Sequence, residues 1–309
     1  MLPPLREIMP QKSRGERPGC PYVRPRFRVF GGALASLQRT DGGPVADRTF
    51  VATLDAVADA MRAKAKLPVD RAFMLAVLGG AYIALAAFGS TVIACDLSAS
   101  PETYGLGRCL SGLLFPVGLM LVVLGGAELF TGNCLMTEAV RRKTLSLPAM
   151  LRSWALVYLG NLAGAVAVAC LLHASGLFSS AGGKVAAAVL RTAAAKSSLG
   201  PSEAFVLGIF CNWLVCLAVW LSSRTDTLAH KALLLFFPIW LFVASGYEHS
   251  VANMYYLAAG LFASSSPEAL AAVPSALASA LTMPAILSNL LFVGRIRQRE
   301  PKSTPLTQP

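Results

Sequence analysis

The most distinctive polar group in the sequence is a histidine within an apolar stretch. His249 follows Glu248 and precedes Asn253 in the segment GYEHSVANM, inside the apolar run from Ala232 to Phe262. Ionisable side chains cost free energy inside a lipid bilayer, so in membrane spans they usually mark functional sites. Burial favours the neutral imidazole, so His249 is expected to donate a hydrogen bond or relay a proton transiently rather than remain a cation.

A second apolar run carries a related polar pattern. The segment ELFTGN places Glu128 and Asn133 in the same E-x-x-x-x-N spacing. Because the carboxylate recurs, we expect both glutamates to be structural and to hold the local backbone by accepting N–H bonds. The imidazole does not recur, since Leu129 takes the position that corresponds to His249. This difference singles out His249 as the functional group.

The composition is that of a membrane protein. Of 309 residues, 55% are hydrophobic and 14% are charged, and the mean hydropathy is +0.59. A soluble domain of this length carries far more charge. The net charge of +11 falls mostly in the first 71 residues and in short loops. No stacking aromatic residues or recognition motif accompany the basic tail, so nucleic-acid binding is not expected.

Six apolar runs are long enough to cross a bilayer as helices. The predicted spans are Arg71–Cys95, Gly107–Val140, Leu147–Leu177, Ser202–Ser222, Lys231–Ala263 and Ser275–Gly294. Basic residues gather after the second span, after the fourth span and at the C-terminus, which predicts that both termini are cytoplasmic.

The spans define three regions and a location. We expect residues 1–70 to be a mobile basic cytoplasmic tail, with a short interfacial helix from Asp55 to Met61. Residues 71–294 form the six-helix domain, and residues 295–309 form a second cytoplasmic tail. An integral protein of the plasma membrane is expected.

The six spans divide into two related halves. The segment FMLAVLGGAYIALAAF of the first span aligns without a gap with FVLGIFCNWLVCLAVW of the fourth. The second and fifth spans share E-x-x-x-x-N, and the third and sixth share LGNL and LSNL. Because each half has three spans, the second half enters the membrane from the opposite face, which is the inverted-repeat architecture of transport proteins.

The second and fifth spans are too long for single straight helices. The run from Ala232 to Phe262 would extend about 46 Å as one helix, against a hydrocarbon core of about 30 Å. Glycine and polar residues lie where the excess length falls, so we expect a break in each. Half-helices that start near Asn133 and Ser250 would turn their positive ends toward the centre and attract an anion.

Four motifs together resemble the formate/nitrite transporter family: GGAELFTGN, GNLAGA, CNWLVCLAVW and SGYEHSVANM. The resemblance covers roughly Arg71 to Gly294. It implies an aquaporin-like fold that assembles as a homopentamer with one pore in each protomer. Substrates in the family include formate, nitrite, hydrosulfide and, in parasitic protozoa, lactate with a proton. The long basic N-terminal tail favours a eukaryotic, protozoan member.

The resemblance also implies roles for particular residues. The family's central histidine falls on His249, its threonine of the first broken helix on Thr131, and its asparagine of the sixth span on Asn289. Its vestibule lysine falls on Lys196, and the basic residue that opens the first span is Arg71 here. Two simpler interpretations stay open: Thr131 could cap a half-helix that begins at the next glycine or asparagine, and Lys196 could be an ordinary loop charge.

These residues suggest a transport mechanism. Lys196 attracts a small monocarboxylate such as formate or L-lactate, and Phe130 and Leu129 belong to apolar constrictions beside His249. A bare anion is costly there, so we expect it to gain a proton, from the medium or through His249, before it crosses. No cofactor is expected. His173 lies too far from His249 for the two to share a metal.

Three alternatives are weighed against this mechanism. Nitrite or hydrosulfide could be the main substrate within the same family. An aquaporin-type channel for neutral solutes would carry paired Asn-Pro-Ala loops, and neither break contains proline. A membrane-embedded enzyme would need a nucleophile–base pair or a metal cluster, which a single intramembrane histidine does not supply, so an enzyme is not expected.

Overall fold

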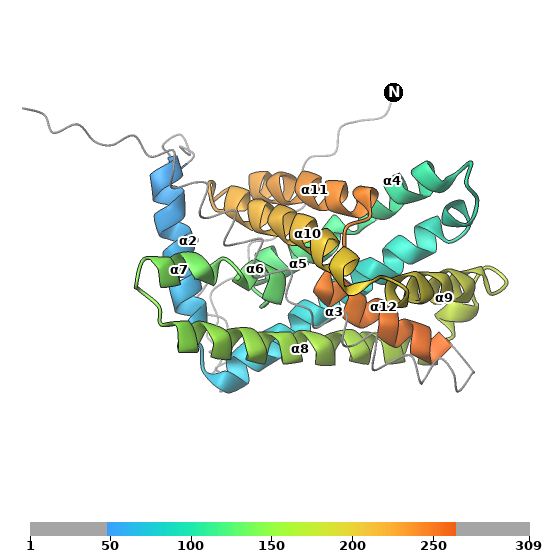
Figure 1. The fold of residues 1–309 in the computed structure, drawn as a ribbon, viewed down its shortest axis with the longest axis horizontal. Coiled ribbons are helices and arrows are strands. Elements are labelled where there is room, and N and C mark those ends of the chain that lie inside the picture. Colours follow the sequence, from blue (N-terminus) through green and yellow to red (C-terminus); the bar gives the residue numbers. More distant parts are fainter. Residues whose placement is uncertain (1–47, 264–309) are drawn as a thin grey trace, which may run out of the picture. The chain divides into compact units, whose positions relative to one another are not determined.

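The structure, a computed structural model, describes residues 48–263 (Figure 1). Within this range every regular element is helical, as the sequence predicts. The predicted sixth span Ser275–Gly294, with Asn289, and most of the predicted N-terminal tail lie outside the described residues.

Five apolar helical spans occur within residues 48–263. They are α3 (Val69–Ala94), the consecutive helices α4 (Tyr104–Leu114) and α5 (Pro116–Gly125), α8 (Leu147–Ala174), α10 (Pro201–Ser222) and α11 (Leu228–Ser245). The starts of these helices follow local chemistry. The Ser146 hydroxyl accepts a hydrogen bond from the Ala149 N–H group at the start of α8, and Pro201 opens α10, where its missing N–H group costs nothing.

The second and fifth spans are both broken, as the sequence predicts. Gly126 (φ +76°) caps the C-terminal end of α5 and Gly246 (φ +82°) caps that of α11; both are repeat-related glycines in the left-handed conformation that side chains disfavour. The chain then re-enters helix as α6 (Phe130–Asn133) in the first half and α12 (Ser250–Ala263) in the second. The second break therefore starts its half-helix at the predicted residue.

The first break differs from the prediction in its starting point. The half-helix α6 begins at Phe130, three residues before the expected Asn133, and is followed by α7 (Met136–Arg141). Leu129 takes the N-cap position and Thr131 lies inside the first turn. Thr131 therefore does not cap this half-helix, and its hydroxyl is available for a contact elsewhere.

Two helices flank the spans. The first, α2 (Phe50–Ala65), includes the predicted Asp55–Met61 helix but is longer, and it forms within residues that the sequence assigns to a mobile tail. Its buried residues Val57 and Met61 pack in a cluster with Met136 of α7 and Trp154 of α8. Arg142, just after α7, forms ion pairs with Asp55 of α2 and with Glu138 of α7. These contacts fix α2 beside the first break.

The second flanking helix, α9 (Lys184–Ser197), was expected only as a loop. It packs against α12, where Gly260 lies so close to α9 that an added Cβ would be 2.3 Å from the Ala193 Cβ atom. Single-turn helices η1 (Leu97–Ala99) and η2 (Leu177–Ser179) complete the connections. Lys196, near the end of α9, is thereby held beside the second break.

The first half of the repeat is held together by close packing of α3 against α8 (Figure 1). At Gly164 of α8, an added Cβ would lie 1.9 Å from the Val77 carbonyl oxygen, and at Gly80 of α3 it would lie 2.0 Å from the Asn161 carbonyl oxygen. The two backbones are therefore nearly in contact, as small residues at a helix interface allow.

This packing gives a first prediction. The substitution Gly164→Ala should force α3 and α8 apart and destabilise the protein by about 1–3 kcal/mol, because a backbone atom cannot move aside as a side chain can. The temperature at which the detergent-purified protein loses its native tryptophan fluorescence measures the effect. Gly105→Ala is the control, since nothing lies within 4 Å of the Cβ added there. Equal unfolding temperatures for the two variants would contradict the packing argument.

Candidate functional site

The centre of the site is a hydrogen bond between the two broken helices. His249, 4% exposed, immediately precedes α12, and its Nε2 atom lies 3.2 Å from the Thr131 hydroxyl oxygen of α6. The backbone N–H group of Ala252 donates to the Nδ1 atom of the same ring over 3.0 Å. Because that N–H group can only donate, Nδ1 must be unprotonated, and in the neutral ring the proton is on Nε2.

Two phenylalanine rings line the histidine. The Phe242 ring of α11 stacks on the imidazole at 5.7 Å between ring centroids and an angle of 24°, and Phe115, between α4 and α5, contacts it at 6.3 Å. Both phenylalanines are buried. They were not predicted, because nothing in the sequence separates them from the other phenylalanines of the apolar runs.

The two residues predicted for the constriction have different surroundings. The Phe130 ring packs edge-on against Trp154 at 5.9 Å and Tyr158 at 5.0 Å, both on α8. Leu129 is 2% exposed and lies in the main apolar core. Among the described residues, the aromatic rings that contact the imidazole are those of Phe115 and Phe242.

At each break, the glutamate and asparagine form a cluster with a lysine from a flanking helix, and we call this cluster a lysine–glutamate–asparagine triad. In the first triad the Asn133 amide donates to the Glu128 carboxylate over 2.6 Å, and the Lys64 ammonium group of α2 lies 3.0 Å from the same carboxylate. In the second triad the Asn253 amide donates to Glu248 over 2.8 Å, and Lys196 forms the ion pair.

The triads revise two sequence-based predictions. The carboxylates were expected to accept backbone N–H bonds, whereas the partners in the structure are the side chains of asparagine and lysine. Arg71, the basic residue carried over at the first span, is exposed, and Lys64 is the residue that reaches Glu128. Lys64 was missed because it lies in α2, a segment assigned to the tail, and no signal in the sequence pairs it with a glutamate 64 positions away.

Asn161 holds the backbone of the first break. The residue is fully buried; its amide nitrogen donates to the carbonyl oxygens of Ala76 (2.7 Å) and Glu128 (2.9 Å), and its amide oxygen accepts from the Phe130 N–H group (2.9 Å). The sequence marks this asparagine through the LGNL motif that matches LSNL and through the overlapping GNLAGA motif. The matching Asn289 lies outside the described residues.

The backbone contacts of the two breaks follow the repeat. The Glu128 N–H group donates to the Leu75 carbonyl oxygen over 3.1 Å, and the Glu248 N–H group donates to the Leu207 carbonyl oxygen over 3.4 Å. Leu75 and Leu207 occupy the same column of the alignment of the first and fourth spans. The two breaks are therefore anchored alike, one on α3 and one on α10.

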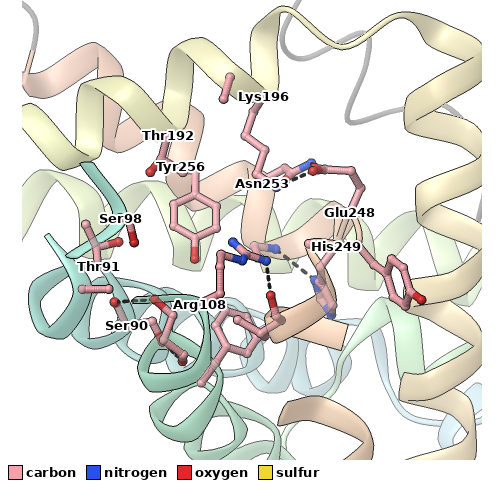
Figure 2. Close-up of a pocket in the computed structure, with 18 of the residues that line it drawn as sticks. Ser90, Thr91, Ser98, Arg108, Thr192, Lys196, Glu248, His249, Asn253 and Tyr256 are labelled. Carbon is pink, nitrogen blue, oxygen red and sulfur yellow. Dashed lines mark hydrogen bonds and ion pairs between the residues drawn. The ribbon is translucent and has the colours of Figure 1, made fainter. Parts of the chain in front are cut away.

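A pocket of about 400 Å³ leads to one side of His249 (Figure 2). Three cationic residues line it, Arg108 of α4 and Arg191 and Lys196 of α9, together with the hydroxyl groups of Ser90, Thr91, Ser98, Ser111, Thr192 and Tyr256. Phe115, Phe242 and His249 form its apolar inner end. Within residues 48–263 no group of three or more histidine, cysteine or acidic side chains could hold a metal ion.

Two repeat-related helix breaks, joined at a buried imidazole that ends a basic pocket, define a membrane transport protein of the inverted-repeat class. The model of the formate/nitrite transporter family matches residues 51–294, so the chain belongs to this family. The resemblance seen in the sequence is thereby confirmed. The protein is a channel or transporter of the membrane, not an enzyme.

Several relatives are similar to this chain. The probable formate transporter of Methanothermobacter thermautotrophicus is 38% identical over 213 residues, which is 64% of this chain and 78% of the relative. The formate channel FocA of Haemophilus influenzae is 39% identical over 198 residues, which is 63% of this chain and 69% of the relative.

Solved structures give the same fold. An FNT family ion channel superposes with a TM-score of 0.71 and 30% sequence identity, covering 81% of this chain and 100% of that one. A pentameric formate channel with formate bound superposes with a TM-score of 0.64 and 30% identity, covering 74% of this chain and 96% of that one. The predicted all-α membrane fold is confirmed.

Proposed function

We propose that the protein carries small monocarboxylates, formate first and L-lactate among the others, across the plasma membrane together with protons. The position of His249 at the apolar inner end of a basic pocket is the observation that carries this proposal. The names of the relatives, formate transporter and formate channel, support the substrate class. The pentameric formate channel that superposes on this chain supports assembly as a homopentamer.

In this mechanism the anion enters from the pocket that contains Lys196. Basic side chains raise the local concentration of anions, and low-dielectric walls strengthen their field. With both termini in the cytoplasm, as the distribution of basic loops favours, this pocket faces outward and the Lys64 triad faces inward. In this orientation both termini are cytoplasmic, and α2 packs on the cytoplasmic side of the six-helix domain of residues 71–294.

The apolar end of the pocket sets the condition for passage. A bare carboxylate between the Phe115 and Phe242 rings loses its hydrating water molecules, and the apolar rings offer no hydrogen bonds in their place. The neutral acid passes at a much lower cost in free energy. The anion therefore gains a proton before it reaches the rings. Two of the remaining candidate groups take supporting roles: Thr131 orients the imidazole, and the triads hold the breaks.

The source of the proton follows from the histidine geometry. Protonating Nδ1 of His249 would set a ring N–H group against the Ala252 N–H group, so a relay through both ring nitrogens is opposed in this conformation. The Nε2–H group of His249, which faces the Thr131 hydroxyl in the structure, therefore acts as a hydrogen-bond donor that exchanges Thr131 for the passing substrate. The proton that crosses with the substrate comes from the medium.

A pH series tests the proposal. Uptake of labelled formate into proteoliposomes should rise by up to about tenfold for each unit of fall in external pH, since the protonated fraction follows the proton concentration above the acid's own pKa. An imposed pH gradient should also drive formate inward without a formate gradient. Uptake that is independent of external pH would contradict the proposal.

Nitrite or hydrosulfide remains the second candidate substrate, because the family matched by the chain is named for nitrite as well as formate. A panel of formate, L-lactate, nitrite and hydrosulfide in one reconstituted preparation decides between them. Uptake of glycerol or water alone would instead indicate a neutral-solute channel.

A further inference from the structure

The charge of Lys196 is already compensated. Its ammonium group forms an ion pair with Glu248, and the two side chains are 18% and 9% exposed. The remaining cations of the pocket, Arg108 and Arg191, have no carboxylate within ion-pair distance among the described residues. The net positive charge of the pocket therefore lies on the two arginines.

The two arginines differ in their surroundings. Arg191 is exposed, and its Nη2 atom donates to the Cys95 carbonyl oxygen over 2.8 Å. Arg108 is partly buried beside the second break, where an added Cβ at Gly246 would be 3.3 Å from its Nη2 atom. Arg108 and His249 line the same pocket (Figure 2).

The guanidinium group of Arg108 is used on one edge only. Its Nε atom donates to the Ala244 carbonyl oxygen (3.4 Å), and its Nη2 atom donates to the Val243 carbonyl oxygen, so the Nε–Nη2 edge binds the last carbonyl groups of α11. These bonds account for two of the five N–H donors. The outer edge, with both N–H groups of Nη1 and the second of Nη2, makes no bond to the described residues.

We propose that this outer edge of Arg108 binds the incoming anion by two parallel hydrogen bonds, as a waiting site between the pocket mouth and His249. The paired N–H donors match a planar anion with two oxygen atoms, such as formate, another monocarboxylate or nitrite. A monatomic anion such as chloride cannot accept the two parallel hydrogen bonds on two separate atoms. The site thus selects anions by shape before the apolar rings select against charge. This inference rests on the proposed function.

The position of Arg108 lets one side chain serve two purposes. Its inner edge satisfies carbonyl groups at the end of α11, where a cation is favoured by the helix dipole. This attachment also fixes the direction of the outer edge, so little side-chain entropy remains to be lost when the anion binds. A flexible lysine at this position would keep the charge but present a single point donor.

The first experiment uses the unaltered protein. Phenylglyoxal bonds to the two Nη atoms of arginine, the same edge that the anion would occupy, and peptide mass spectrometry counts the adduct at each arginine. Saturating formate or nitrite should slow the labelling of Arg108 by about tenfold, and chloride at equal ionic strength by less than about twofold. Arg191 should be labelled at the same rate throughout. Equal labelling of Arg108 with and without formate overturns the inference.

The second experiment compares Arg108→Lys with Arg191→Lys, which also keeps its charge. In proteoliposomes Arg108→Lys should raise the KM for formate about tenfold with little change in the maximal rate, and Arg191→Lys should leave both within about twofold. An unchanged KM in Arg108→Lys overturns the inference. If this variant does not fold, the labelling experiment decides alone.

The two proposals fail in different ways. If the unaltered protein takes up no formate at any pH, the proposed function is wrong, while protection of Arg108 can still be measured. If the unaltered protein transports formate but formate does not protect Arg108, only the waiting site is wrong.

Discussion

Replacing Asn161 by leucine is expected to prevent the protein from folding stably. The side chains have similar volume, but leucine cannot bond the Phe130 N–H group or the Glu128 carbonyl oxygen, which lie in the first break or at its edge. Each buried polar group left without a partner costs about 1–3 kcal/mol. With the bond to the Ala76 carbonyl oxygen also lost, three bonds are removed and the total is about 3–9 kcal/mol, a large part of the stability of a folded protein.

The yield of monodisperse protein in detergent and its unfolding temperature measure this effect. Ser153→Ala is the control, since it also replaces a buried polar side chain on α8 without touching the break. We expect Ser153→Ala to behave as the unaltered protein. An Asn161→Leu variant that is purified in normal yield and transports normally would show that the first break holds itself without this asparagine.

The second large effect is expected at His249, where substitution by phenylalanine should lower the rate of formate uptake by about 100-fold or more. Removing one well-placed donor from a dry site costs a factor of this size where charge must be stabilised. The introduced phenylalanine would place a third apolar ring beside Phe115 and Phe242, and the passing substrate would lose the Nε2–H donor. Thr131→Val, which removes only the hydroxyl that orients the imidazole, should lower the rate less.

Initial rates of labelled formate uptake at fixed external pH measure this series. The control is His173→Phe, because His173 lies near the end of α8 and stacks on Phe262 rather than on the rings around the site. Equal protein incorporation into the liposomes is checked by immunoblot. If His249→Phe transports as fast as the His173→Phe control, the central role assigned to the imidazole is wrong.

The breaks show which parts of the site could be predicted from the sequence. Gly126 and Gly246 end their helices because glycine tolerates the left-handed conformation, a property local to the residue. The pairs Glu128–Asn133 and Glu248–Asn253 bond within five residues of sequence, so their spacing alone brings them together. The start of α6 was missed by three residues, because a four-residue helix has too little local sequence to fix its boundary.

The contacts that complete the site join distant segments. Lys64 reaches Glu128 across 64 positions of sequence, and Phe242 comes to the imidazole beside Phe115, which is 127 positions away. No local pattern encodes such pairings, because they depend on how helices are rotated and how deeply they sit against one another. Arg108 is likewise joined to a distant segment, because its Nε–Nη2 edge binds the carbonyl groups of Val243 and Ala244 on α11.

The sequence by itself determined the membrane class, the inverted repeat, the two breaks and the choice of His249, because each depends on composition or on spacing along one chain segment. The tertiary structure alone decided the partners: which rings surround the imidazole, which lysine neutralises each glutamate, and which nitrogen of His249 carries the proton. These depend on packing and on hydrogen-bond direction between helices far apart in sequence, and a bond is specified only when both of its ends are placed.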